Sequence, residues 1–260
     1  MDYHLAIPSY RRAEMLGKKT LRFLQASGAP TPTIYVADQQ DYDAYKALYP
    51  DLPIVIAQKG LVNCRNFIQN NQPIGKKIVF IDDDIEDIYR LDFTALPKQK
   101  KLKIRDFNKL IEIGFECAER AGTTFWGVYP TDMTMSLKPF IRRNLCYMVG
   151  AFYGIINSRL SNSMEWAEDF DRTLLYWEKE GRLCRLEFVG VNTKYYTNKG
   201  GLQETRNELL KAEDCHKLAE RHPNLCKVVK KRGHTELQFT RFPSYMIDVR
   251  EITSDNTSHN

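Results

Sequence analysis

The chain has 260 residues, of which 43% are hydrophobic and 27% are charged, and its formal net charge is +5. This composition excludes a wholly disordered chain and suffices for one domain with a full core. We expect that domain over residues 1–253, followed by a disordered tail at 254–260 that lacks an apolar anchor. The mild positive charge is compatible with a polyanionic partner, and equally with an ordinary solvated surface.

The N-terminus, the hydropathy pattern and the cysteines all favour a cytoplasmic protein. The sequence opens on a strand-like segment instead of a secretion signal, and it has no apolar run of the roughly 18 residues that would span a bilayer. Its six cysteines have no regular spacing and form no CxxC pair, which is typical of small buried side chains in a reducing compartment. We therefore expect no membrane anchor.

Short apolar runs alternate with amphipathic stretches through the first third of the chain. The pattern predicts strands at 5–10, 33–38, 53–58 and 77–84, separated by helices at 13–26, 42–48 and 61–70. This alternation is typical of an α/β fold with a doubly wound, mostly parallel central sheet and flanking helices.

The middle of the chain is less regular. We expect a helix over 104–121 ended by Gly122, and an apolar strand segment over 145–157 that Gly150 and Gly154 interrupt. A further helix is expected over 163–179, behind a polar cap, and a helical extension follows towards the C-terminus.

Polar residues follow the predicted strands at the points where ligands bind such sheets, outside the carboxyl ends. The most conspicuous are Asp82, Asp83 and Asp84, three carboxylates beside an apolar strand. That much negative charge is unfavourable near a core unless a cation neutralises it. On a strand, Asp82 and Asp84 would point to the same side, and such oxygen ligands suit Mg²⁺ or Mn²⁺ held with a diphosphate. The alternative is an acidic turn without a ligand.

Five motifs in order resemble the GT-A glycosyltransferases, and together they extend over most of the chain. They lie at residues 7–11, 36–38, 60–66, 80–84 and 166–169. The resemblance implies a GT-A fold with a nucleotide-binding half over about residues 1–95 and an acceptor half over about 96–253, a UDP-sugar donor, and Mn²⁺ or Mg²⁺ as cofactor. It implies metal ligands at Asp84 and Asp82. The donor-binding residues that it implies are Pro8, Ser9, Tyr10, Arg11, Asp38, Gly60, Asn63, Arg65, Asp82 and Asp83.

Glu168 and Asp169 match the acidic pair that supplies the base in inverting members of that class. An acceptor hydroxyl loses its proton as it attacks the anomeric carbon, and a carboxylate within hydrogen-bond reach can take that proton. We expect Asp169 to be the base and Glu168 to orient the substrate. An acidic first helical turn that complements the helix dipole, and a retaining outcome, both stay open.

Two later features are further candidates for the donor site. Residues 195–206 combine paired glycines with cations, which suits a loop that closes on a diphosphate and equally suits an ordinary loop. The candidate donor-binding residues here are Lys199, Gly200, Gly201 and Arg206. A late histidine, His216 or His234, is a candidate metal ligand, with a plain exposed histidine as the alternative.

The acidic string at 168–172, followed by the glycine pair, resembles the phage TET-associated glycosyltransferases. That resemblance implies 5-hydroxymethylcytosine in phage DNA, possibly already glycosylated, as acceptor, and the host cytoplasm as location. Such an acceptor requires a basic groove and extrusion of the base, and Lys227, Lys230 and Lys231 could contribute to the groove. Two alternatives remain: a cytoplasmic transferase that builds a glycan or capsule, and a non-catalytic module that binds modified DNA.

Overall fold

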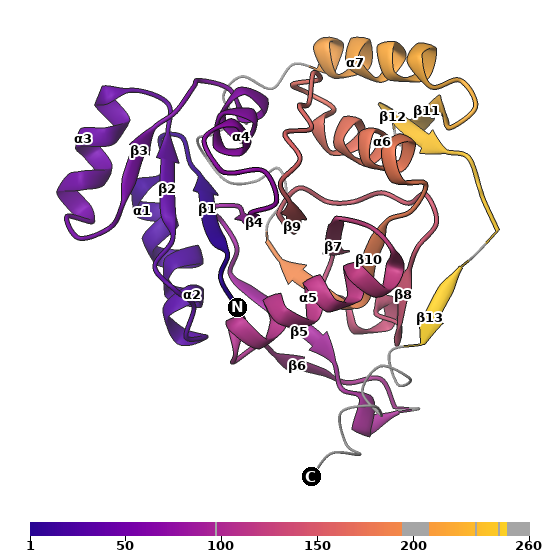
Figure 1. Ribbon diagram of the computed structural model, residues 1–260, viewed down its shortest axis with the longest axis horizontal. Helices are drawn as coiled ribbons and strands as arrows, with labels where there is room; N and C mark the ends of the chain where they lie inside the picture. Colours follow the sequence, from indigo (N-terminus) through magenta and orange to yellow (C-terminus); the bar gives the residue numbers. More distant parts are fainter. Residues whose placement is uncertain (97, 194–207, 232, 244, 249–260) are drawn as a thin grey trace.

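The computed structural model describes residues 1–96, 98–193, 208–231, 233–243 and 245–248. Figure 1 shows a central sheet with helices on both sides. The expectations for the tail at 254–260, and for Lys199, Gly200, Gly201 and Arg206, lie outside the described residues.

The first half of the sheet is parallel, as the alternating pattern predicts. Its strands are β1 (His4–Pro8), β2 (Thr33–Val36), β3 (Ile54–Ile56) and β4 (Lys77–Ile81), in the order β4-β1-β2-β3. The connections are α1 (Ala13–Leu16), the π-helical turn η1 (Gly17–Leu21), α2 (Arg22–Ala26), α3 (Gln39–Leu48) and α4 (Leu61–Asn70).

The second half of the sheet is mixed. β9 (Phe152–Ile156) runs antiparallel to β4 and to β7 (Phe125–Tyr129), and β7 pairs in parallel with β10 (Cys184–Asn192). β10 also pairs with β5 (Asp87–Leu91), which carries β6 (Lys101–Lys103), and with β8 (Phe140–Arg142), which carries β13 (Met246–Asp248). Two short 3-10 turns, η2 (Phe93–Ala95) and η3 (Thr134–Ser136), lie in the connections.

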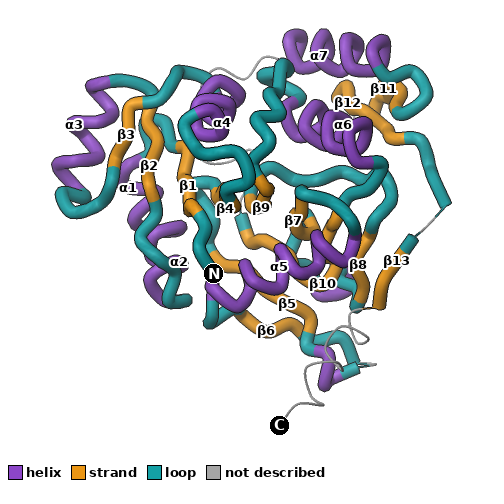
Figure 2. The backbone as a smooth tube through the Cα atoms, in the orientation of Figure 1, coloured by secondary structure: helices purple, strands orange, loops and turns teal. Residues whose placement is uncertain are grey.

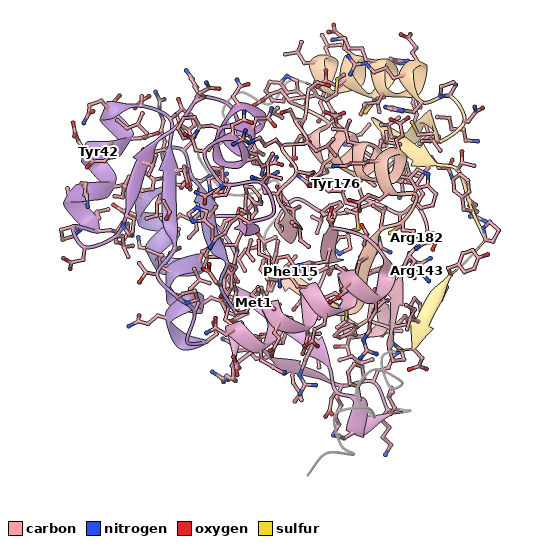
Figure 3. All side chains as sticks on the ribbon, in the orientation of Figure 1. Met1, Tyr42, Phe115, Arg143, Tyr176 and Arg182 are labelled. Carbon is pink, nitrogen blue, oxygen red and sulfur yellow. The ribbon has the colours of Figure 1, made fainter. Side chains whose placement is uncertain are left out.

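Helices cover both faces of this sheet, which confirms the expected α/β class. One face packs on α1, α2 and α5 (Phe107–Ala121), and the other on α4 and α6 (Glu168–Glu180). Phe115 of α5, labelled in Figure 3, meets Trp126 of β7 edge to face at 5.7 Å. Gly114 and Gly154 flank the Trp126 ring so closely that a β-carbon on either would overlap it, which explains the glycine within β9.

The C-terminal extension is a helix followed by a hairpin. Helix α7 (Glu208–Arg221) precedes the antiparallel strands β11 (Cys226–Lys231) and β12 (His234–Phe239). Both elements lie beside α6 (Figure 2), where apolar side chains of the three elements form one cluster. Its members include Leu174, Cys215, Leu218, Cys226 and Leu237.

Two predicted elements begin five or more residues too early, whereas the other boundaries differ by three residues or fewer. The predicted strand at 145–157 is a strand only over β9, because residues 145–151 run as a loop into the cleft described below. The predicted helix at 163–179 begins five residues later, at Glu168. The Asp171 carboxylate accepts hydrogen bonds from the Ser163 and Met164 amides, at 2.5 and 3.1 Å, and holds this segment as a loop.

All six cysteines are buried free thiols, as expected. Among the helices of the described segments, none is long and apolar enough to cross a membrane.

Candidate functional site

A cleft of about 770 Å³ opens at the carboxyl ends of β1, β2 and β4. Loops after these strands form one wall, and the start of α6 with the C-terminal hairpin forms another. Of the predicted site residues, the cleft brings together Pro8, Ser9, Tyr10, Gly60, Asp82, Asp83, Asp84, Glu168 and Asp169.

The acidic triplet lies in a turn rather than on a strand, because β4 ends at Ile81. The turn is fixed from below by Thr20, whose hydroxyl donates to the Asp82 carbonyl at 2.7 Å and accepts from the Ile85 amide at 3.0 Å. Thr20 belongs to the π-helical turn η1, an irregularity that often marks functional sites.

The Asp83 carboxylate is paired within the protein. Its carboxylate accepts from the Ser9 hydroxyl at 2.6 Å and from Arg12 at 3.1 Å, and the side chain is buried. Asp84 accepts from Thr193 at 2.9 Å and lies 3.6 Å from Arg12. Asp83 thus lines the cleft and also anchors the turn to the end of β1, and its contact with a donor stays a prediction.

Arg65 is a buried bridge and not a residue of the cleft surface. Its side chain is 2% exposed, and its guanidinium donates to Asp82 at 2.9 Å, to the Gly150 carbonyl at 2.9 Å and to Glu168. This corrects the prediction of direct donor contact. Arg65 instead joins the aspartate turn to the acidic pair at the start of α6.

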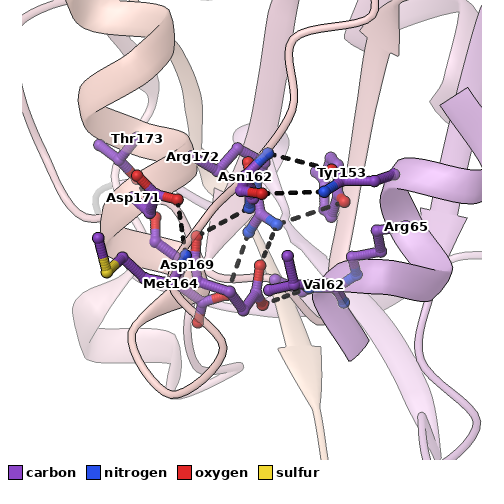
Figure 4. A network of polar contacts seen from close by, with 12 residues as sticks. Val62, Arg65, Tyr153, Asn162, Met164, Asp169, Asp171, Arg172 and Thr173 are labelled. Carbon is purple, nitrogen blue, oxygen red and sulfur yellow. Dashed lines mark hydrogen bonds and ion pairs between the residues drawn. The ribbon is translucent and has the colours of Figure 1, made fainter. Parts of the chain in front are cut away.

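The acidic pair is held by a second arginine, as Figure 4 shows. Arg172, one helical turn further along α6, donates to Glu168 at 2.6 Å and to Asp169 at 3.1 Å. Asp169 also accepts from the Tyr147 hydroxyl at 2.6 Å, and its side chain stays 23% exposed at the cleft. Glu168 is thus fully occupied, while Asp169 faces the space where a substrate would lie.

The two carboxylates differ in proton affinity. Burial alone would raise the pKa of Glu168, but the charges of Arg172 and Arg65 outweigh it and hold this pKa well below its ordinary value. Burial and the neighbouring Glu168 charge raise the pKa of Asp169. A carboxylate with a raised pKa is a stronger base, so Asp169 is the better suited of the two to take a proton.

Gly150 permits the close approach of these groups. A β-carbon at this position would lie 2.9 Å from Arg65, 2.6 Å from Glu168 Oε1, and closer still to Asp169 Oδ1. Only glycine leaves room for both carboxylates and the guanidinium around one backbone segment. This is the physical reason for the first of the two glycines that interrupt the apolar segment.

Several predicted residues do not line the cleft. Arg11 lines a separate cavity between α1 and α3, and Asp38 caps α3 by accepting from the Asp41 amide at 2.9 Å. Asn63 is exposed and donates to the Lys59 carbonyl at 3.0 Å. His216 and His234 are exposed outside the cleft, the latter 3.4 Å from Glu208. Asn63 and His216 lie on exposed positions of α4 and α7, whereas His234 lies on strand β12.

The carboxylates suit a divalent cation that arrives with a diphosphate. In the described parts of the chain no three His, Cys, Asp or Glu side chains form a ready-made metal site. Magnesium-type sites, however, commonly use one or two carboxylates plus substrate phosphates, and Asp82 and Asp84 both line the cleft. With all groups ionised, the linked network has a formal charge of −2, from five carboxylates and three guanidiniums: Asp82, Asp83, Asp84, Glu168, Asp169, Arg12, Arg65 and Arg172.

Sequence reasoning assigned no site role to four residues that line the cleft or hold its carboxylates: Arg12, Tyr147, Glu165 and Arg172. Glu165 caps α4 from a distance by accepting from the Leu61 and Val62 amides at 2.8 and 3.2 Å. Only Arg172 had a detectable signal, because a residue four places after Glu168 lies on the same helix face.

Comparison with known proteins agrees with this fold. The fold is similar to that of mannosyl-3-phosphoglycerate synthase from Rubrobacter xylanophilus, with a TM-score of 0.50, 12% identity, and coverage of 97% of this chain and 89% of that one. It is also similar to glucosyl-3-phosphoglycerate synthase from Mycobacterium tuberculosis, crystallised with Mn²⁺ and UDP, with a TM-score of 0.50, 9% identity, and coverage of 96% and 91%. A search of curated protein sequences gave no significant match.

The fold is of the GT-A type, and the family match identifies a glycosyltransferase. Residues 3–201 match the model of the TET-associated glycosyltransferases, and the chain belongs to that family.

Proposed function

We propose that the protein transfers a sugar from a UDP-sugar to a hydroxyl of 5-hydroxymethylcytosine in DNA, with or without a sugar already attached, and with inversion at the anomeric carbon. The observation that carries the proposal is the position of Arg65, which hydrogen-bonds both Asp82 of the aspartate turn and Glu168 of the acidic pair. One buried guanidinium thereby fixes the donor-side carboxylate relative to Glu168, the residue next to the proposed base Asp169, and such positioning is a large part of catalysis.

The residues around Asp169 suit the proton transfer that inversion requires. The acceptor O–H bond breaks as its oxygen bonds to the anomeric carbon, the proton passes to Asp169, and the bond from that carbon to the diphosphate breaks. Tyr147 and Arg172 hold the carboxylate in place, at 2.6 and 3.1 Å, and Glu168 fixes Arg172 in turn.

Asp82 and Asp84 would hold Mn²⁺ or Mg²⁺ at the turn, next to the β1 loop with Pro8 and Tyr10. When bound, the cation supplies Lewis-acid stabilisation of the leaving diphosphate. The crystals of the mycobacterial enzyme with Mn²⁺ and UDP support this assignment by analogy of fold.

Family membership and charge support the proposed acceptor. The family description links these transferases to the TET system, and a net charge of +5 suits a polyanionic acceptor. We further propose that the protein acts in the cytoplasm, which is the host cytoplasm if the gene is carried by a phage.

The test is a transfer assay with Mn²⁺, a panel of UDP-sugars, and DNA containing 5-hydroxymethylcytosine, analysed by mass spectrometry of the nucleosides. We expect a hexose or pentose adduct on hydroxymethylcytosine, none on unmodified DNA, and none with Asp169→Asn. Transfer to saccharide or lipid-linked acceptors alone would select a glycan transferase instead. DNA binding without UDP binding, turnover or hydrolysis would select a binding module.

A further inference from the structure

The C-terminal helix and hairpin complete the cleft. The family match ends at residue 201, but the cleft is also lined by residues of α7, β11 and β12 beyond that point. These residues are Lys211, Lys231, Glu236, Leu237, Gln238 and Phe239. The segment that matches the family thus supplies the aspartate turn and the acidic pair, and a segment outside the match supplies the facing wall.

This wall places aromatic rings beside the proposed base. The Phe170 ring lies 5.0 Å from the Tyr147 ring and 5.5 Å from the Phe239 ring, and all three line the cleft. Tyr147 is the residue whose hydroxyl donates to Asp169. A ring-shaped ligand that packs against these faces would therefore lie next to the carboxylate that accepts its proton.

Two lysines at the same wall add positive charge. Lys211 of α7 and Lys231 of β11 line the cleft, and within the described ranges neither forms an ion pair with a carboxylate. Aromatic faces alone would suit a sugar ring as well as a nucleobase. The adjacent cations favour a ligand in which a planar ring is flanked by phosphates, which is one nucleotide of a nucleic-acid strand.

The wall is joined firmly to the catalytic segment. Leu237 packs in the cluster that α6 shares with α7 and the hairpin, and Asp214 of α7 accepts from the Trp166 amide at 2.9 Å. Trp166 lies two residues before Glu168, so the position of the wall is fixed relative to the acidic pair.

We propose that Tyr147, Phe170 and Phe239 form the acceptor subsite, in which an extruded nucleobase stacks, and that Lys211 and Lys231 bind the phosphates beside it. This inference rests on the proposed function and adds the residues that select the acceptor. Proteins bind unpaired bases largely by stacking them on aromatic side chains. Extrusion from the duplex exposes the base face that stacks.

The first test compares Phe239→Leu with Phe242→Leu in the full chain. Leucine retains apolar bulk in the packed cluster but offers no aromatic face. Phe242 packs on Trp177 at 5.2 Å and does not line the cleft, so it is a matched control. We expect Phe239→Leu to raise the KM for hydroxymethylated DNA about tenfold, with UDP affinity unchanged, and Phe239→Tyr to restore it. An unchanged KM in Phe239→Leu, beside an active wild type, would overturn the subsite and leave the proposed function standing.

The second test measures how the KM for hydroxymethylated DNA depends on salt. Lys231→Ala should reduce the slope of log KM against log salt by about one unit, and Lys230→Ala, on the opposite face of β11, should leave it unchanged. Equal slopes for Lys231→Ala and wild type would overturn the phosphate contact, as would equal use of an uncharged saccharide acceptor. A wild type that shows neither transfer nor hydrolysis of any UDP-sugar would instead refute the proposed function itself.

Discussion

Replacing Gly150 by alanine should displace the catalytic carboxylates while the protein still folds. The added β-carbon would lie 2.6 Å from Glu168 Oε1, and nearer still to Asp169 Oδ1, whereas ordinary van der Waals contact begins at 3.4 Å. The acidic pair must therefore move by roughly 1 Å, a misplacement that can cost about 100-fold in rate. The overpacking itself should cost about 1–3 kcal/mol of unfolding free energy.

The assay is the transfer rate at saturating UDP-sugar, with UDP affinity by calorimetry and stability by chemical denaturation. Gly28→Ala is the matched control, because Gly28 has φ +66° and nothing within 4 Å of a β-carbon. Its backbone strain should cost about 1 kcal/mol without touching the cleft. We expect Gly150→Ala to lose transfer and retain UDP affinity, and Gly28→Ala to retain both. Full transfer by Gly150→Ala would refute the close packing of the acidic pair and its role.

Three further outcomes are expected. Because burial and the Glu168 charge raise the pKa of Asp169, kcat/KM should fall as the pH drops through that raised pKa and level off above it. A rate that rises towards acid would contradict a carboxylate base. Tyr147→Phe removes a hydrogen bond to the charged form of Asp169, so the rising limb of the pH profile should move to higher pH, and an unmoved limb would remove Tyr147 from the site. Chelation by EDTA should lower transfer roughly 100-fold, with Mn²⁺ restoring it, and metal-independent transfer would rule out a cation at Asp82 and Asp84.

The first half of the fold could be predicted because its signals are local. Helix α4 has the bounds that the apolar pattern predicts, residues 61–70, β2 to β4 fall within the predicted strands, and β1 begins one residue before its predicted start. Since parallel strands place their carboxyl ends at one edge, the sequence also located the aspartate turn and Ser9 at one cleft. Those predictions needed only strand order and the residues that follow each strand.

The rest of the site depends on contacts between distant segments, which periodicity does not encode. The sequence predicted that Arg65 and Asp83 would contact a donor. In the structure, Arg65 is buried and hydrogen-bonds Glu168. Asp83 is buried and hydrogen-bonds Ser9 and Arg12. The predicted helix start at residue 163 failed because Asp171 takes the two amides that would have opened the helix.

The central claim is that Asp82 and Asp84 bind a nucleotide diphosphate through a divalent cation. Calorimetric titration of UDP with and without Mn²⁺, for the wild type and for Asp84→Asn, tests it most directly. We predict that Mn²⁺ increases the UDP affinity of the wild type about tenfold or more, and that the variant loses this gain. Equal UDP affinities in all four titrations would contradict the claim.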